Sequence, residues 1–511
     1  MSRSPRGAIE RPVLACLATG LLAVVAASSL SGCGGGDASV ADAGRAKPLG
    51  ASAPQFAASA VFVSPTGSDS ADGTRDHPWR TLTHAVSTLK AGYTLYAEGG
   101  TYAETLTVWR AGTAALPITI TAYPGQHPVI DAASLSVPSW SGLLQVYGNY
   151  VTVSGFELRN MNVDGHGGLG GAAVVQGGFG AVVYGANDTI ASMTIHDTWA
   201  QGILVQGDAG TVTDTVVHDV ALSNCRTAGR ANCMPASTVA SGWPSCVSIA
   251  SPFGSGHVTH GGTIQRTTVY DCWGEGVSTW LSDGMTIQDN TTYDNWAENL
   301  YVDNATNVLV QRNLVYNTPG NLVGKKSGFA LADEYTNTSA SQPNPLSSRV
   351  VVIDNLVYNA SFSAYNWTLV GGSGLVDDVI ANNTFVDTDP TTQAFMTGGP
   401  ANTVPVANVG STIANNIIIG ANTLPSSAGI AFSHNLWTAA PGAGAGPGDV
   451  LIANGAAVIA QGGAPQPGAL AASWFWLTPM SPAHVAGVPV PQVTSTYDGS
   501  PVQSPPDIGA F

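Results

Sequence analysis

Acidic and aromatic side chains crowd together in the stretch YDNWAENLYVDN, which runs from Tyr293 to Asn304 in a 511-residue chain that is only 10% charged. The pattern Tyr-Asp-x-Trp-x-Glu also begins at Tyr270, 23 positions earlier, so Glu275 and Glu298 occupy equivalent positions. If this period is one turn of a stacked repeat, the two glutamates lie about 5 Å apart at the backbone. Two carboxylates at that separation do not both ionise readily, which favours either an acid–base pair or a bridging cation.

The same spacing places Trp280, Asp303 and Lys326 in a second column of equivalent positions. Asp303 and Glu298 are candidate ligands for a calcium ion, which prefers carboxylate oxygens. A lysine whose pKa is lowered by burial or by a nearby cation can remove the C5 proton of a uronic sugar, and we predict this role for Lys326. Glu334 precedes a polar stretch that could line a cleft, and it joins the two glutamates and the lysine as a candidate catalytic residue.

Aromatic side chains lie beside these acids in the sequence and could stack on the faces of sugar rings. The candidates for substrate binding are Trp273, Trp280, Trp296 and Tyr301. Acidic residues at the exposed turns of a repeat protein would give the same pattern without any binding site. Two interpretations of the cluster are therefore open, a functional surface and a structural turn.

Internal repeats with a period of 22–23 residues extend beyond this stretch, as in the pair His196 and His218. Short alternating runs rich in β-branched residues, ended by Gly, Asn or Asp, predict short strands joined by tight turns. Three such strands per period, without a helical pattern, predict about ten coils of a parallel β-helix between Tyr150 and Trp437. A recurrent asparagine should form a ladder at one corner of the coils, at Asn290, Asn313, Asn355, Asn383 and Asn416.

The segment from Trp79 to Leu89 predicts an amphipathic helix that closes the N-terminal end of the core. It lies in the run VSPTGSDSADGT…HPWRTL…AV…GYTLYAEGGTY, which resembles the opening of right-handed parallel β-helix proteins of the pectin-lyase superfamily, particularly family nine pectate lyases. The closing motifs SPAHVAG and PDIGAF are similar to the end of many secreted β-helix proteins. The resemblance implies an all-β fold, a single-stranded right-handed parallel β-helix over residues 61–440, followed by a closing segment over residues 441–511.

Family nine pectate lyases bind calcium through several aspartates and use a lysine as the base, and the resemblance implies related chemistry. The stretch that matches their calcium-site strand runs from His196 to Ile203, and Ala200 and Gln201 stand where an acid is expected. At this strand, the chain therefore lacks an acidic residue that the calcium site of that family has.

The N-terminus has the features of a bacterial export signal. Three arginines precede the apolar run VLACLATGLLAVVAASSL, and the string LSGC, which ends at Cys33, resembles a lipobox. We expect a signal peptide over residues 1–32, lipidation of Cys33, and a flexible linker over residues 33–60, which are rich in Ala, Gly and Ser. The expected location is outside the cytoplasm, with a lipid anchor in the outer membrane or at the cell surface.

Four cysteines remain beyond this signal, and they cluster around one Gly-, Ser- and Pro-rich excursion. They are Cys225, Cys233, Cys246 and Cys272. An even number, export, and the absence of CxxC spacing favour disulfides over a zinc site, with three pairings open.

The net negative charge of the chain limits the classes of molecule that it can bind. The chain carries −16, and removing residues 1–32, with three Arg and one Glu, leaves −16 − 2 = −18. Such a chain should repel nucleic acid and anionic lipid, so we expect membrane contact only through the lipid anchor. We expect a monomer whose partner is a polysaccharide bound along one sheet.

Three functions fit these observations. A polysaccharide lyase would use calcium and Lys326, and the resemblance slightly favours it. A glycoside hydrolase would use two of the carboxylates, and the negative charge, which suits a neutral glycan, favours that alternative. A non-catalytic carbohydrate-binding or adhesive scaffold would use the aromatic residues alone.

Overall fold

A computed structural model describes most of the chain from residue 56 onwards. The described residues are 56–511 except 136, 139, 162–177, 223–224, 226–243, 253–256, 320–326, 335–344, 369–372, 388, 390–391, 399–406 and 462–465. Residues 54–511 form one compact unit, which contains all the elements below. The predicted signal peptide, Cys33 and the linker up to residue 55 lie outside the described residues.

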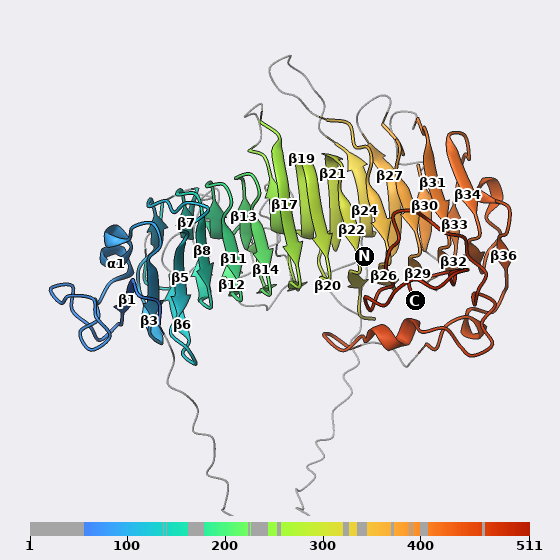
Figure 1. Cartoon of the computed structure of the whole chain (residues 1–511). Coiled ribbons are helices and arrows are strands. Elements are labelled where there is room, and N and C mark those ends of the chain that lie inside the picture. Colours follow the sequence, from blue (N-terminus) through green and yellow to red (C-terminus); the bar gives the residue numbers. More distant parts are fainter. Residues whose placement is uncertain are drawn as a thin grey trace, which may run out of the picture. The chain divides into compact units, whose positions relative to one another are not determined.

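The unit is a stack of coils in which each coil contributes one strand to each of three parallel rows. Figure 1 shows the strands of successive coils side by side in chain order, from helix α1 at one end to β36 at the other. Rows one and two join into a 23-stranded sheet through β19, a 14-residue strand that belongs to both, and row three is a separate 13-stranded sheet. All strand pairs in the rows are parallel, as the prediction of a parallel β-helix requires.

Row one carries the candidate site on its outer face. Its strands are β4 (Leu106–Val108), β7 (Ser141–Val146), β10 (Gly178–Val183), β13 (Ile203–Val205), β16 (Ser245–Ala250), β19 (Glu275–Gln288), β21 (Leu300–Thr306), β24 (Ser327–Asp333), β27 (Ser361–Thr368), β30 (Phe395–Thr397) and β33 (Asn422–Thr423).

Along the chain, each strand of row two follows a strand of row one and is followed by a strand of row three. Its strands are β1 (Ala60–Val63), β2 (Thr94–Ala97), β5 (Ile118–Ala122), β8 (Val151–Ser154), β11 (Thr189–Ala191), β14 (Thr211–Thr213), β17 (Thr259–Gln265), the end of β19, β22 (Leu309–Gln311), β25 (Val351–Ile353), β28 (Val379–Ala381), β31 (Ser411–Ala414) and β34 (Ile430–Ser433).

Row three completes each coil, after row two and before row one of the next coil. Its strands are β3 (Gly100–Tyr102), β6 (Pro128–Asp131), β9 (Glu157–Met161), β12 (Thr194–Thr198), β15 (Val216–His218), β18 (Thr268–Tyr270), β20 (Thr291–Tyr293), β23 (Leu314–Tyr316), β26 (Leu356–Tyr358), β29 (Thr384–Asp387), β32 (Ile417–Gly420), β35 (Leu436–Trp437) and β36 (Val450–Leu451). The ten strands from β9 to β35 fall between Tyr150 and Trp437, in agreement with the predicted ten coils.

Apolar side chains fill the interior in columns that run along the stack. In row one, Val277, Leu300, Phe329, Phe362 and Phe395 occupy paired positions on successive strands and are fully buried. Because strand residues alternate between faces, each of these residues has neighbours in sequence on the outer face of the row. The interior column therefore determines which residues face outwards at the candidate site.

Helix α1 (Leu82–Thr88) closes the N-terminal end, as predicted, but it is shorter than expected. The Thr81 side chain caps the helix by accepting a hydrogen bond from the His84 N–H at 3.1 Å. Trp79 instead makes a parallel β-bridge to Val63, and Leu89 has extended backbone angles, so neither belongs to the helix.

The predicted asparagine ladder is present and fully buried at the turn between rows two and three. Each side-chain amide donates to the amide oxygen of the next asparagine, with N–O distances between 2.9 and 3.0 Å. Asn435 extends the ladder by one coil beyond the predicted positions. The residue before each ladder asparagine has a positive φ, as at Asp289 (57°) and Asp354 (56°), a region that Asp and Asn adopt more readily than most residues.

Aromatic rings stack on the outer face of row three, where the sequence repeats align. His196, His218, Tyr270, Tyr293 and Tyr316 follow one another with ring centroids 4.7 to 5.0 Å apart. The 22- and 23-residue repeats at these positions therefore correspond to single coils.

The C-terminal segment folds back along the coils, beneath β26, β29 and β32 in Figure 1. It contains the short 3-10 helices η2 (Gly442–Gly444), η3 (Gly455–Ala457) and η4 (Ala472–Phe475). The Gly468 N–H donates to the Tyr316 hydroxyl at 2.9 Å, and the Gly509 N–H donates to the Asn415 carbonyl at 2.7 Å. Strand β36 lies within the predicted closing segment and pairs with β35, so row three continues past residue 440.

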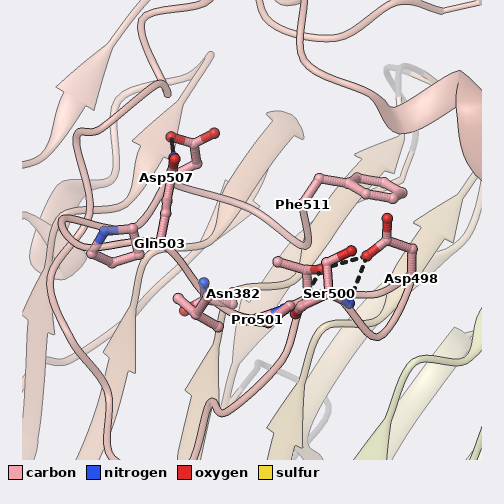
Figure 2. Close-up of a pocket in the computed structure, with 10 residues that line it drawn as sticks. Asn382, Asp498, Ser500, Pro501, Gln503, Asp507 and Phe511 are labelled. Carbon is pink, nitrogen blue, oxygen red and sulfur yellow. Dashed lines mark hydrogen bonds between the residues drawn. The ribbon is translucent and has the colours of Figure 1, made fainter.

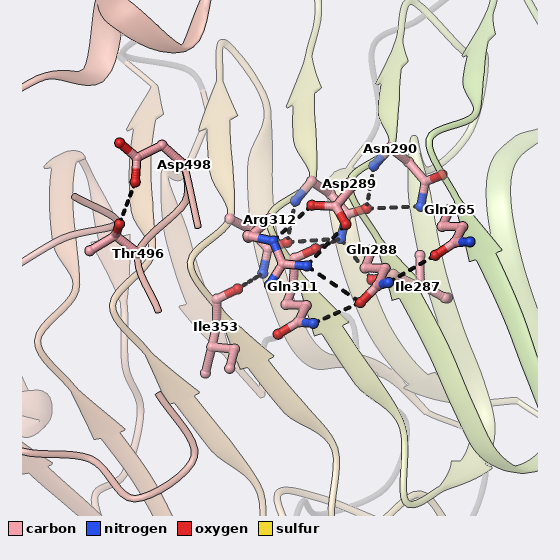
Figure 3. A network of polar contacts seen from close by, with 12 residues as sticks. Gln265, Ile287, Gln288, Asp289, Asn290, Gln311, Arg312, Ile353, Thr496 and Asp498 are labelled. Atoms are coloured by element: carbon pink, nitrogen blue, oxygen red, sulfur yellow. Dashed lines mark hydrogen bonds and ion pairs between the residues drawn. The ribbon is translucent and has the colours of Figure 1, made fainter. Parts of the chain in front are cut away.

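A polar network covers the outer corner beside this segment (Figure 3). Gln311 donates its side-chain amide to Gln288 at 2.7 Å, one coil away. The Arg312 guanidinium donates to both carboxylate oxygens of Asp289, at 2.7 and 3.0 Å. These contacts join neighbouring coils on the outside, as the asparagines do on the inside. Within the described residues, no helix is long and apolar enough to cross a membrane.

Candidate functional site

Two columns of side chains point outwards from row one at the stretch from Tyr293 to Asn304 and on the coil before it. Val277 and Val302 belong to the main core, so Ser278, Tyr301 and Asp303, which alternate with them, lie on the outer face. Trp280 pairs with Asp303 on the next strand, as the 23-residue spacing predicts.

Glu275 and Glu298 occupy equivalent positions on adjacent coils, which confirms the alignment on which the candidate site depends. Val277 pairs with Leu300, and the Gly276 N–H donates to the Glu298 carbonyl at 2.8 Å. Burial raises the pKa of Glu275 well above its usual range, and the carboxylates of Glu298, Asp303 and Glu334 raise it further. The four carboxyl groups therefore interact electrostatically, and we call them the acidic cluster.

Asp303 is the second buried carboxyl of the cluster. Burial, followed by the nearby Glu334 carboxylate, raises the pKa of Asp303 well above its usual range, although the Glu334 N–H donates to its Oδ1 at 2.9 Å. Glu298 and Glu334 are half-buried and reach the surface. The cluster therefore combines two buried carboxyls whose pKa values are raised with two carboxyls that are more accessible.

Glu275 is oriented by two serine hydroxyls that are not among the predicted site residues. The Ser245 hydroxyl donates to Glu275 Oε2 at 2.6 Å, and the Ser278 hydroxyl donates to Ser245 at 2.6 Å. Ser245 lies 30 positions before Glu275, outside the 23-residue period, so no repeat pointed to it. These hydroxyls hold the carboxyl in one orientation from the side of the preceding strand.

Tyr301 lies over the acidic cluster, where the sequence predicted a substrate-binding residue. Its side chain is only 5% exposed, and its hydroxyl has no hydrogen-bond partner among the described residues. Burial, followed by Asp303 and Glu334, raises the pKa of Tyr301 well above its usual range. A buried donor without a partner is costly, and the predicted contact of Tyr301 with a substrate stays a prediction because the side chain is buried.

The three tryptophans of the prediction lie in different surroundings. Trp280 is half-buried and packs against an outer-face apolar cluster that includes Phe179 and Leu204. Trp296 is half-buried against the main core. Trp273 is 2% exposed within that core, so, contrary to the prediction, it has no face free for a sugar ring. The turn before β19 directs it inwards.

The predicted column of Trp280, Asp303 and Lys326 is wrong at its third member. Asp303 pairs with Ala332, 29 positions later, because this coil is longer than 23 residues. Lys326 itself lies outside the described residues, and its role as a base stays a prediction.

Calcium ligation by Asp303 and Glu298 stays a prediction. Within the described part of the chain, no three carboxylate, imidazole or thiolate groups converge in a way that could hold a metal ion. The described residues therefore do not by themselves form the expected calcium site.

A disulfide joins Cys246 and Cys272, with Cα atoms 6.3 Å apart, and links β16 to the turn before β19. Cys225 is also disulfide-bonded, and Cys233 lies outside the described residues. The predicted disulfide framework is confirmed for the described cysteines, and it fastens the two strands that carry Ser245 and Glu275.

A pocket of about 250 Å³ lies elsewhere, between the C-terminal segment and Asn382 (Figure 2). Asp498 accepts hydrogen bonds from Thr496 and Ser500, and Asp507 accepts one from the Val485 N–H at 2.6 Å. Because these carboxylates stabilise turns of the segment itself, we assign this pocket a structural role.

Two sequence-family models match the chain. One, described as a Pel9A-like right-handed beta helix region, matches residues 61–241, and the other, described as a right-handed beta helix region, matches residues 179–385. The chain has the right-handed parallel β-helix fold. The acidic cluster lies beyond the Pel9A-like match and within the general β-helix match.

Curated relatives match only parts of this β-helix. The chain is 32% identical over 152 residues to the uncharacterized protein YwoF of Bacillus subtilis (strain 168), covering 29% of this chain and 30% of that protein. It is 40% identical over 84 residues to the pectate lyase PEL9 of Emericella nidulans, covering 16% of this chain and 20% of that protein. The chain thus spans less than a third of the length of either relative.

Solved structures resemble the β-helix at low sequence identity. The pectate lyase Pel9A has a TM-score of 0.48 and 14% identity, over 88% of this chain and 96% of that one. PfbA, a surface adhesin of Streptococcus pneumoniae, has a TM-score of 0.43 and 13% identity, over 70% and 79%.

Proposed function

We propose that this β-helix hydrolyses a polysaccharide bound along the outer face of row one. The observation that carries the proposal is the acidic cluster, in which a buried Glu275 with a raised pKa lies one coil from the more accessible Glu298. Glycoside hydrolysis by carboxyls about 5 Å apart needs such a pair, a carboxylic acid that protonates the glycosidic oxygen and a carboxylate that attacks the anomeric carbon.

In this mechanism, Glu275 gives its proton to the glycosidic oxygen as the bond from that oxygen to the anomeric carbon breaks. The Glu298 carboxylate attacks the anomeric carbon as that bond breaks and forms a covalent glycosyl ester. Glu275, now deprotonated, takes a proton from a water whose oxygen displaces Glu298 from the anomeric carbon, so that one water is consumed per bond. The Glu334 carboxylate keeps the potential negative, which stabilises positive charge on the sugar ring in the transition state. Trp280 and Trp296, which are half-buried, contact the apolar face of the bound sugar.

The second candidate is β-elimination from a uronic-acid polysaccharide, with Lys326 as base and calcium held near Asp303 and Glu298. Its support is the Pel9A-like match and the pectate lyase among the relatives. A calcium ion would neutralise the uronate carboxylate. The −18 charge of the mature chain opposes binding of a polyanion and so favours hydrolysis.

A panel of neutral and uronic-acid polysaccharides, assayed with calcium or with EDTA, distinguishes these functions. For hydrolysis we expect new reducing ends from a neutral chain, unchanged by EDTA and without ultraviolet-absorbing products. Unsaturated uronide products that disappear with EDTA would establish the lyase instead. Binding without any cleavage would leave only the adhesive scaffold.

We also propose that the protein works as a monomer anchored outside the cytoplasm through a lipid on Cys33. Replacing Cys33 with serine should abolish incorporation of labelled palmitate and move the protein from the membrane fraction to the soluble fraction. The matched control, Cys16→Ser, alters a cysteine inside the signal peptide and should change neither result. Labelled palmitate in the Cys33→Ser variant would contradict the anchor, and sedimentation of the purified chain tests the monomer.

A further inference from the structure

Three aromatic rings stack on the outer face of row one, at the end far from the acidic cluster. The Trp109 and Tyr147 ring centroids are 3.9 Å apart with planes inclined by 6°, and those of Tyr147 and Tyr184 are 4.8 Å apart at 15°. Trp109 is 69% exposed and Tyr184 is 38% exposed. Among the described residues, β4 is the first strand of row one, so no further strand of that row precedes the one that carries Trp109.

The stack lies in the same column as the acidic cluster. Each ring directly follows a core residue of row one, and these core residues pair from Val108 through Val146 and Val183 to Val205. Hydrogen bonds from the Tyr147 and Tyr184 N–H groups to the preceding strand, at 2.9 and 2.8 Å, extend this pairing into the aromatic positions.

The column continues without interruption to the candidate site. Val205 pairs with Ile249, Ile249 with Thr279, and Thr279 with Val302. The residues that follow them, Ala250, Trp280 and Asp303, pair with one another in turn. Tyr184 is four coils from Asp303, which corresponds to about 19 Å at about 4.8 Å per coil.

The chemistry around the rings suits uncharged sugars. The Tyr147 hydroxyl donates to the Gln145 side-chain oxygen at 3.3 Å, and the Gln145 amide donates to the Thr107 hydroxyl at 3.4 Å. Rings bordered by amide and hydroxyl groups offer apolar contact to the carbon–hydrogen faces of a sugar and hydrogen bonds to its hydroxyls. The neighbouring basic side chain, Arg110, donates to the Ser87 carbonyl at 2.8 Å and is not directed at the rings.

We propose that Trp109, Tyr147 and Tyr184 form a distal binding platform for uncharged sugar units of the same polysaccharide chain that the acidic cluster cleaves. This inference rests on the proposed function and adds to it the chemical class of the substrate and the minimum length of its chain. The ligand is an extended, neutral chain that lies along the coil axis. A short oligosaccharide bound at the cluster does not reach the rings.

Affinity electrophoresis of the full chain in mild detergent tests the platform. The gels contain xylan, galactomannan or mixed-linkage β-glucan as neutral polymers, or polygalacturonate as an anionic one. We expect a neutral polymer to retard the wild type, and Trp109→Ala to weaken this affinity about tenfold, the effect of removing a central aromatic contact. The control is Trp476→Ala in the C-terminal segment, a tryptophan that is 56% exposed and far from the column, which should bind as the wild type does.

Kinetics with the polymer that is cleaved give the second readout. Trp109→Ala should raise KM about tenfold for the polymer, leave kcat unchanged, and leave both constants unchanged for the shortest cleavable oligosaccharide. Equal retardation of the Trp109→Ala and Trp476→Ala variants would overturn the platform, while cleavage by the wild type would leave the proposed function intact. If none of the four polymers retards or is cut by the wild type, both proposals fail.

Discussion

Replacing Glu275 with glutamine should lower polysaccharide turnover about a thousandfold, because glutamine cannot give the glycosidic oxygen a proton. Glutamine keeps the shape of the side chain and can still accept the hydrogen bond that Ser245 donates at 2.6 Å. Binding of the polysaccharide should therefore persist, and affinity electrophoresis beside a reducing-end assay measures both. Turnover by the wild type should fall as pH rises through the raised pKa of Glu275, since the acid is active only while protonated.

The stability of this variant separates catalysis from folding. A glutamate whose pKa is raised in the folded state costs stability as pH rises, because the unfolded chain loses the proton first. Glu275→Gln should therefore unfold no more readily than the wild type at neutral pH. Glu98→Gln, the same change near the first coil, should leave turnover unchanged. Undiminished turnover in Glu275→Gln, or loss of turnover accompanied by a lower Tm, would contradict a catalytic role.

Replacing Asp354 with asparagine should stabilise the protein by up to about 5 kcal/mol near pH 7.5. Burial raises the pKa of Asp354 to about 8, opposed in part by Arg312, and neither carboxylate oxygen has a hydrogen-bond partner among the described residues. In the unfolded chain the same group ionises near pH 4. Its contribution to stability is therefore fully present below about pH 4 and is lost as pH rises to about 8. Asparagine avoids this loss and tolerates the positive φ of 56° at this corner.

Thermal unfolding at pH 5 and pH 8 measures the effect. The Tm difference between Asp354→Asn and the wild type should be small at pH 5 and larger at pH 8. The matched control is Asp289→Asn, at the same corner two coils away, where the carboxylate is paired with Arg312 at 2.7 Å. That variant should gain no stability at either pH. A Tm difference for Asp354→Asn that does not grow between the two pH values would show that the wild-type carboxyl is not held protonated.

Repetition in the sequence predicted the coil and much of the acidic cluster. In a parallel β-helix, equivalent residues of neighbouring coils lie directly over one another, so the same side chain recurs wherever stacking favours it. The ladder from Asn290 to Asn416 and the stacked Tyr270, Tyr293 and Tyr316 are visible in the sequence for this reason. The alignment of Glu275 with Glu298 follows from the same spacing.

Only the tertiary structure decided which side chains share a column once the coil length changes. Insertions at the turns are tolerated because they leave the strands paired, so Asp303 pairs with Ala332 after 29 positions and Tyr316 with Tyr358 after 42. Ala332 therefore occupies the column position that a constant period assigns to Lys326, and Ser245 contributes to the site although no repeat predicts it. Burial likewise separated Trp273, inside the core, from Trp280, outside it, because the turn between two strands sets the direction of a side chain. The local order of residues determines the period, whereas the lengths of the loops and the packing of the coils determine the site.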